Sequence, residues 1–271
     1  LVGEPIWKRG YRAELSTTAP LREDLAQSAI RMALAGDPAQ TAPRSLFVPF
    51  AGSGTLLFEY LIAFFGIPPF VFRERYAFER FACGVPPSVG WVRRKLSEEL
   101  AGRLKGERRL CAGLVDNDPA AIESVRENLR RFTGAVASTA IAEPQLEGVP
   151  LDLDLVCADV FSEAWSNWLR GRLSTGAQGT EGLFLPLNPP YGIRLPTGST
   201  EELYGRIGEA CRLLSESLRP RRLSGFVLCP TESSWGRFMR GGAGLTFETS
   251  HLTHGGIDIR LCRFRSAEPR A

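Results

Sequence analysis

Histidine, paired cysteines and unbroken apolar stretches are scarce in this chain of 271 residues. The two histidines, His251 and His254, are not accompanied by the cysteine or acidic spacing of a metal site, so no bound metal is expected. The six cysteines form no Cys-x-x-Cys pair and mostly lie in apolar runs, which predicts buried free thiols, a reducing compartment and a cytoplasmic location. The most apolar stretch, residues 46–72, is broken by prolines and glycines, whereas a membrane span needs about 20 apolar residues. Disulfide-stapled, zinc-binding and membrane-spanning proteins are therefore excluded as classes.

The chain also begins without methionine and without the basic and apolar regions of a signal peptide, which predicts a piece of a longer protein. Lysine occurs at three positions only, so arginine supplies most of the 33 basic residues against 30 acidic ones. Arginine suits phosphate recognition because its guanidinium binds bidentately, although a GC-rich genome produces the same bias. The hydrophobic fraction of 44% and the charged fraction of 23% are ordinary for a globular protein with one large domain.

Short apolar runs alternate with amphipathic stretches along most of the sequence. We expect strands at residues 45–50, 110–115, 151–158, 183–187 and 223–229, and a weaker one at 11–15. We expect helices at residues 21–35, 55–65, 91–104, 120–131, 161–173 and 201–218, and a closing strand pair at 245–249 and 257–264. This alternation predicts an α/β fold with a mostly parallel sheet, helices on both faces and a C-terminal antiparallel hairpin. Ligands of such sheets bind at the carboxyl ends of the strands.

A glycine-containing loop follows the first expected strand. Glycine permits a tight turn there and lets the backbone approach a ligand closely, and the free N–H groups of the next helix can bind a carboxylate. The same pattern also occurs in ordinary strand-to-helix turns. The candidate ligand-binding residues of this loop are Pro49, Phe50, Ala51, Gly52, Gly54 and Thr55.

Acidic residues follow the second and third expected strands. Asp116, with Asn117 beside it, has the position of an acceptor for ribose hydroxyls. Asp118 precedes Pro119 and a helix, so we assign it to helix capping instead. Asp159 can accept from the exocyclic amine of an adenine, with Val160 or Phe161 against the ring.

The loop Asn188-Pro189-Pro190-Tyr191 after the fourth expected strand is the most specific signal in the sequence. Its prolines fix the backbone and remove donors, which leaves carbonyl oxygens as acceptors. Asn188 adds a side-chain acceptor and Tyr191 a planar face for stacking. Together they suit a planar group that bears an amine.

Several segments together resemble one enzyme family. They are residues 8–12, 19–25, 50–59, 76–79, 188–195 and 203–204, with the Asp116 loop. Through them the chain, from residue 8 to about 215, is similar to the THUMP-associated S-adenosylmethionine-dependent RNA guanine-N2 methyltransferases. The resemblance implies a Rossmann-like class I methyltransferase fold and S-adenosyl-L-methionine as cofactor. It also implies an RNA partner, ribosomal or transfer RNA, without a metal or a membrane.

The implied mechanism is direct in-line methyl transfer to the exocyclic amine of guanine. Asn188 and the Pro189 carbonyl would accept the N–H bonds of that amine, and Tyr191 would stack under the base. Family members usually carry an acid where this chain has Val48, and usually a preceding THUMP RNA-binding domain, which is absent here. We expect residues 1–40 to be a lead-in segment packed on the catalytic domain. Residues 41–271 would form the methyltransferase domain, with an insertion at about 67–105.

Other functions share the same loop. Enzymes that methylate adenine N6 in DNA, or a glutamine amide in proteins, also use it. The segments around Tyr11, Pro20 and Phe78 favour RNA guanine. Because Val48 stands where the family usually has an acid, a third alternative remains, a catalytically inactive module that binds the cofactor or RNA.

Overall fold

One seven-stranded sheet organises the part of the chain that the computed structural model describes, namely residues 8–13, 21–35, 42–73, 76, 79, 86–139, 148–162, 169, 171, 182–190, 199–219, 221–254 and 257–267. Its strands are β1 (Ser45–Pro49), β2 (Leu110–Asp116), β3 (Leu151–Cys157), β4 (Leu183–Leu187), β5 (Leu223–Cys229), β6 (Leu245–His254) and β7 (Ile257–Ser266). They lie in the order β3-β2-β1-β4-β5-β7-β6. Strands β1 to β5 pair in parallel, whereas β7 is antiparallel to both β5 and β6. The predicted parallel sheet and C-terminal hairpin are confirmed.

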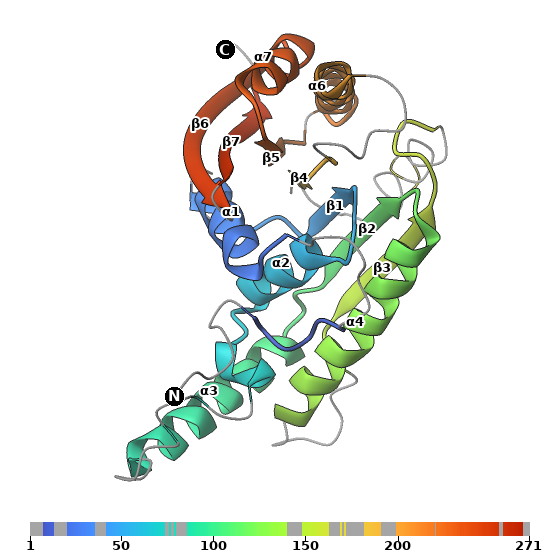
Figure 1. Cartoon of the computed structure of the whole chain (residues 1–271). Coiled ribbons are helices and arrows are strands. Elements are labelled where there is room, and N and C mark those ends of the chain that lie inside the picture. The colour runs from blue at the N-terminus through green and yellow to red at the C-terminus, as the bar shows by residue number, and fades with distance from the viewer. Residues whose placement is uncertain are drawn as a thin grey trace.

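Helices cover both faces of this sheet (Figure 1). They are α1 (Glu23–Ala35), α2 (Thr55–Phe65), α3 (Pro87–Lys105), α4 (Pro119–Thr139), α6 (Thr200–Ser217) and α7 (Glu232–Gly241), with a short 3-10 helix η1 (Pro69–Phe72). Successive side chains of a strand point to opposite faces. Leu46 and Val48 of β1 therefore pack with α1, α2 and α4, whereas Phe47 packs with α6 and α7.

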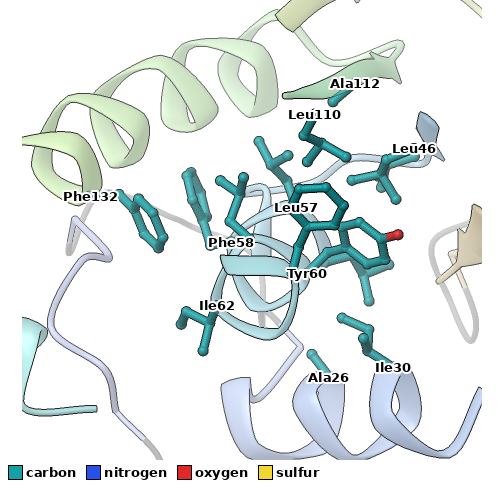
Figure 2. Close-up of a cluster of buried hydrophobic side chains, with 14 of the residues drawn as sticks. Ala26, Ile30, Leu46, Leu57, Phe58, Tyr60, Ile62, Leu110, Ala112 and Phe132 are labelled. Carbon is teal, nitrogen blue, oxygen red and sulfur yellow. The ribbon is translucent and has the colours of Figure 1, made fainter. Parts of the chain in front are cut away.

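We call the helices on the Leu46 and Val48 face of the sheet the first layer, and helix α2 forms its centre. Ten of its eleven residues are buried, because α1, α4 and the sheet surround it. Figure 2 shows Leu57 and Tyr60 of α2 between the strand residues Leu46 and Leu110 and helix α1, with Phe58 on the side of Phe132 of α4. The α2 helix begins directly after the glycine loop, so this packing fixes the loop relative to the sheet.

The described part of the lead-in segment packs on the same layer. The Tyr11 ring is 1% exposed and its centroid lies 4.9 Å from that of Phe58 and 5.7 Å from that of Phe132. Helix α1 packs along α2. The division into residues 1–40 and 41–271 stays a prediction.

The structure differs from the expected elements in several places; α4 continues to Thr139 instead of residue 131, and β6 continues to His254 instead of residue 249. Residues 11–13 form no strand, because Tyr11 is held by side-chain contacts rather than by strand pairing; residues 14 and 15 lie outside the described part. Helix α7 was not expected, and α3 begins at Pro87 instead of Trp91. Ile67 and Val71, at the start of the expected insertion, are buried in the first layer, and the insertion itself stays a prediction. Most of the helix expected at 161–173 lies outside the described residues.

None of the helices in the described ranges is both long enough and apolar enough to cross a membrane.

Candidate active site

The glycine loop between β1 and α2 has an unusual backbone. Phe50, Gly52 and Gly54 all have positive φ angles, of 59°, 52° and 83°. Phe50 is the only described residue other than glycine with a positive φ. This conformation costs free energy in a residue with a side chain, and such residues typically occur at functional sites. A Cβ on Gly54 would lie 2.8 Å from the Phe58 ring, whereas a Cβ on Gly52 would meet nothing within 4 Å. The space beside Gly52 is therefore open to a ligand.

Asp116, at the end of β2, holds this loop from one side. Its Oδ2 accepts from the Gly52 backbone N–H at 2.8 Å, and its Oδ1 accepts from the Asp118 N–H at 3.0 Å. Each carboxylate oxygen keeps a second lone pair, so the carboxylate can still accept from hydroxyls. Asn117 beside it is exposed.

Asp118 caps α4, as predicted. Its Oδ1 accepts from the Ala120 N–H at 2.9 Å, and its carbonyl oxygen accepts from the Ile122 N–H.

Two residues that sequence analysis missed hold the loop from the other side. The Asn128 side chain of α4 donates to the Ser53 carbonyl at 2.9 Å and accepts from the Ala13 N–H at 2.7 Å. Arg12 Nη2 donates to Thr55 Oγ1 at 2.8 Å. Arg12 belongs to a segment that carried the family resemblance, but no role was assigned to it. Asn128 lies in an ordinary amphipathic helix, so no sequence signal distinguished it.

Asn188 follows β4, which pairs with β1, so its loop lies at the same sheet edge as the glycine loop. The β1–β4 pairing covers Ser45 with Leu183 and Leu46 with Phe184, so both strands run toward this edge in the same direction. Its side-chain oxygen is buried and has no hydrogen-bond partner in the structure as described. A buried acceptor without a donor costs about 1–3 kcal/mol, and such groups often await a ligand. Pro189 is buried, and Tyr191 lies outside the described residues.

The loop after β3 lies at the same edge of the sheet as the loops after β1, β2 and β4. Asp159 is exposed, and its Oδ1 accepts from the Phe161 N–H at 2.7 Å. Val160 lines a small apolar hollow together with Pro49 and Phe50, between the sheet and α6. The loops after β1 and β3 thus meet at an apolar surface.

A buried carboxylate lies in α2, the helix that follows the glycine loop. Glu59 of α2 is completely buried, and this burial raises its pKa to about 7, although Arg9 and Tyr11 oppose the shift. Tyr11 Oη donates to Glu59 at 3.0 Å, and Arg9 lies 3.4 Å from it. With its amide turned so that nitrogen faces Glu59, Gln27 donates to the same carboxylate at 2.6 Å. Glu59 therefore ties the lead-in segment and α1 to α2.

Across the described ranges, no three His, Cys, Asp or Glu side chains are grouped to hold a metal ion.

Comparisons with known proteins are consistent with this arrangement. The profile of the family UPF0020, the RMKL-like methyltransferase domain, matches residues 9–150. The ribosomal RNA large subunit methyltransferase K/L of Chromohalobacter salexigens is 32% identical over 221 residues, which cover 78% of this chain and 25% of that protein. The chain thus spans about a quarter of the length of this curated relative.

Solved structures share the architecture. A possible methylase from Clostridium difficile 630 superposes with a TM-score of 0.67 at 21% identity, covering 99% of this chain and 58% of that one. SMU.472, solved in complex with SAH, gives 0.65 at 20% identity and covers 98% and 57%. The fold is the α/β fold of class I methyltransferases, as predicted.

Proposed function

The chain belongs to the RMKL-like methyltransferase domain family, and we propose that it transfers a methyl group from S-adenosyl-L-methionine to the exocyclic N2 amine of guanine in structured RNA, ribosomal or transfer RNA. The observation that carries this proposal is the orphaned Asn188 oxygen at the end of β4, the strand that pairs with β1. The relative's name, a ribosomal RNA large subunit methyltransferase, supports RNA as the substrate class.

The sheet edge fits the proposed cofactor. The open space at Gly52 admits a ligand against the backbone, and the uncapped first turn of α2 suits a carboxylate. Asp116 would accept from the ribose hydroxyls. Asp159 and Val160 would bind the adenine edge and face, next to the apolar hollow. A solved neighbour of the same fold was crystallised with SAH, the demethylated form of this cofactor.

The chain's own residues would orient the reacting amine. When bound, the cofactor supplies an electrophilic methyl group on a cationic sulfur. An amine conjugated with a base ring is a poor nucleophile, because its lone pair is delocalised. Asn188 Oδ1 and the Pro189 carbonyl would accept its two N–H groups, aim it at the methyl and favour the lone pair on nitrogen. Stacking of a flipped-out base on Tyr191 would contribute about 1–3 kcal/mol and so offset part of the cost of unstacking that base from the RNA helix.

The nature of the product tests this proposal. Purified protein is incubated with methyl-labelled S-adenosylmethionine and, separately, with bulk RNA, with DNA and with a protein extract, and labelled nucleosides or residues are then identified. We expect labelled N2-methylguanosine from RNA. Label in adenine of DNA would instead identify a DNA adenine-N6 methyltransferase, and label in protein glutamine would identify a protein-glutamine methyltransferase. Binding of S-adenosylhomocysteine without transfer to any substrate would favour the inactive module.

A further inference from the structure

Two arginines near the ends of the strands lie over aromatic rings. The guanidinium carbon of Arg206 in α6 is 3.9 Å from the centroid of the Phe161 ring, and that of Arg260 in β7 is 4.5 Å from the centroid of the Trp235 ring. Both distances are within the range of a cation–π interaction. Within the described ranges, neither guanidinium forms a hydrogen bond or an ion pair. Both groups therefore keep their N–H donors available for a ligand.

Arg206 lies over its ring although two acids of the same helix are near it in sequence. Glu202 and Glu209, four residues before it and three residues after it, have the spacing of helical ion pairs. The Glu209 carboxylate lies instead 4.0 Å from the Arg212 guanidinium. Stacking on Phe161 holds the Arg206 guanidinium in one orientation, so it loses less freedom when it binds a ligand. A planar guanidinium held in this way suits bidentate binding of a phosphate.

The first of these arginines is close to the candidate active site. Phe161 lines the apolar hollow together with Phe50 of the glycine loop and Leu187, the residue before Asn188. Arg206 is exposed, so its guanidinium lies at the rim of the hollow and is accessible from solvent.

The second arginine lies on the other side of β4. The pairing of β4 with β5 runs as far as Leu187 and Val227, and Cys229, two residues further along β5, pairs with Arg260 of β7. Arg260 is thus two strands from β4, which is about 10 Å at the usual strand spacing. It is half-buried and lies at the carboxyl end of β5, the edge of the sheet where Asn188 follows β4.

We propose that Arg206 and Arg260 bind backbone phosphates of the RNA substrate on either side of the nucleotide that reaches Asn188. The inference rests on the proposed function, because it assumes that an RNA is presented to this edge of the sheet. Phosphate contacts fix the position of a nucleic acid but do not read its sequence. The two arginines would therefore place the target base, and the loop at Asn188 would select it.

The salt dependence of RNA binding tests these contacts. A fluorescently labelled hairpin RNA is titrated at several potassium chloride concentrations with the wild type, Arg206→Gln and Arg260→Gln. Each lost phosphate contact should lower the slope of log affinity against log salt by about 0.7–0.9. It should also weaken binding at low salt by about 10- to 100-fold. The rate of methyl transfer at saturating RNA should remain that of the wild type, because Asn188 still orients the amine.

Matched variants distinguish these contacts from general charge effects. Arg212→Gln removes an arginine of α6 that pairs with acids of its own helix, and Arg94→Gln removes one with a 67% exposed side chain in α3, which extends away from α6 and α7 (Figure 1). Both control variants should leave the slope unchanged. If a glutamine variant does not fold by thermal denaturation, Arg206→Lys or Arg260→Lys, which keeps the charge, should retain most of the wild-type slope.

The outcomes separate this inference from the proposed function. Wild-type slopes in both Arg206→Gln and Arg260→Gln, or equal losses in the control variants, would overturn the inference alone. A wild-type protein that neither binds nor methylates RNA would overturn the proposed function itself.

Discussion

Glu59 shows at the residue scale how a buried charge couples the lead-in segment to the site. Its carboxylate is completely buried. It accepts a hydrogen bond from the Tyr11 hydroxyl and forms an ion pair with the Arg9 guanidinium. Because burial raises the pKa of Glu59 to about 7, the folded state binds more protons than the unfolded state between about pH 4.5 and 7. The contribution of Glu59 to stability therefore falls as pH rises through that window and is constant above it.

The variant Glu59→Gln tests this coupling, since it keeps the shape and removes the titrating group. We expect the free energy of unfolding of the wild type, relative to the variant, to decrease from pH 5 to pH 8. Urea denaturation at four pH values in this range measures the difference. A difference that does not change with pH would contradict the predicted ionisation of Glu59.

Gly52 makes a second prediction at this scale. Its φ of 52° strains any other residue, at a cost of about 1 kcal/mol for alanine, but its Cβ would meet no protein atom within 4 Å. Gly52→Ala should therefore fold with slightly lower stability and bind S-adenosylhomocysteine far more weakly, because the methyl group fills the proposed ligand space. Thermal denaturation and calorimetry measure the two effects separately. Affinity equal to that of the wild type would show that no ligand approaches the backbone there.

At the scale of elements, the contact between α6 and α7 depends on glycine. A Cβ on Gly208 of α6 would lie 2.2 Å from the Phe238 carbonyl oxygen of α7, whereas one on Gly205, a turn earlier, would meet nothing. The two helices thus approach so closely that backbone contacts backbone. Through this close packing the ten-residue helix α7 contacts α6 along its length.

Gly208→Ala should lower the free energy of unfolding by about 1–3 kcal/mol, because the helices must separate. Gly205→Ala is the control in the same helix and should be neutral or stabilising by up to about 1 kcal/mol, since alanine has the higher helix propensity. Chemical denaturation of both variants gives the comparison. Equal effects of the two substitutions would argue against a close contact at Gly208.

Elements with strong periodicity or clear boundaries were predictable from sequence. Helix α2 and strands β4 and β5 match their expected residues, because glycine, proline, asparagine or a charged residue flanks each mostly apolar run. Helix α7 was missed because its buried residues are Ser234, which is polar, and Phe238, and one buried apolar residue gives no helical pattern in the sequence. The role of Asp118 could be predicted from local chemistry, since capping involves residues only two to four positions away. Arg12 and Asn128 could not, because their contacts join positions 43 and 75 residues apart.

At the scale of the molecule, the sheet brings four strand ends and the lead-in segment to one edge. Three elements fix the glycine loop: Asp116 contacts Gly52, Asn128 contacts Ser53 and Arg12 contacts Thr55. Such preorganisation suits a reaction in which orientation supplies most of the acceleration. In the proposed mechanism, Asn188 at the end of β4, the strand next to β1, would supply the acceptor that the reacting amine requires.

The most direct test of the account compares chemistry with binding at Asn188. Single-turnover methyl transfer to RNA is measured for the wild type and for Asn188→Ala, alongside the affinity of each for S-adenosylhomocysteine. We expect the variant to lose transfer by at least about 100-fold while its affinity changes little, because the lost acceptor orients the amine. Transfer at the wild-type rate in Asn188→Ala would contradict the central claim.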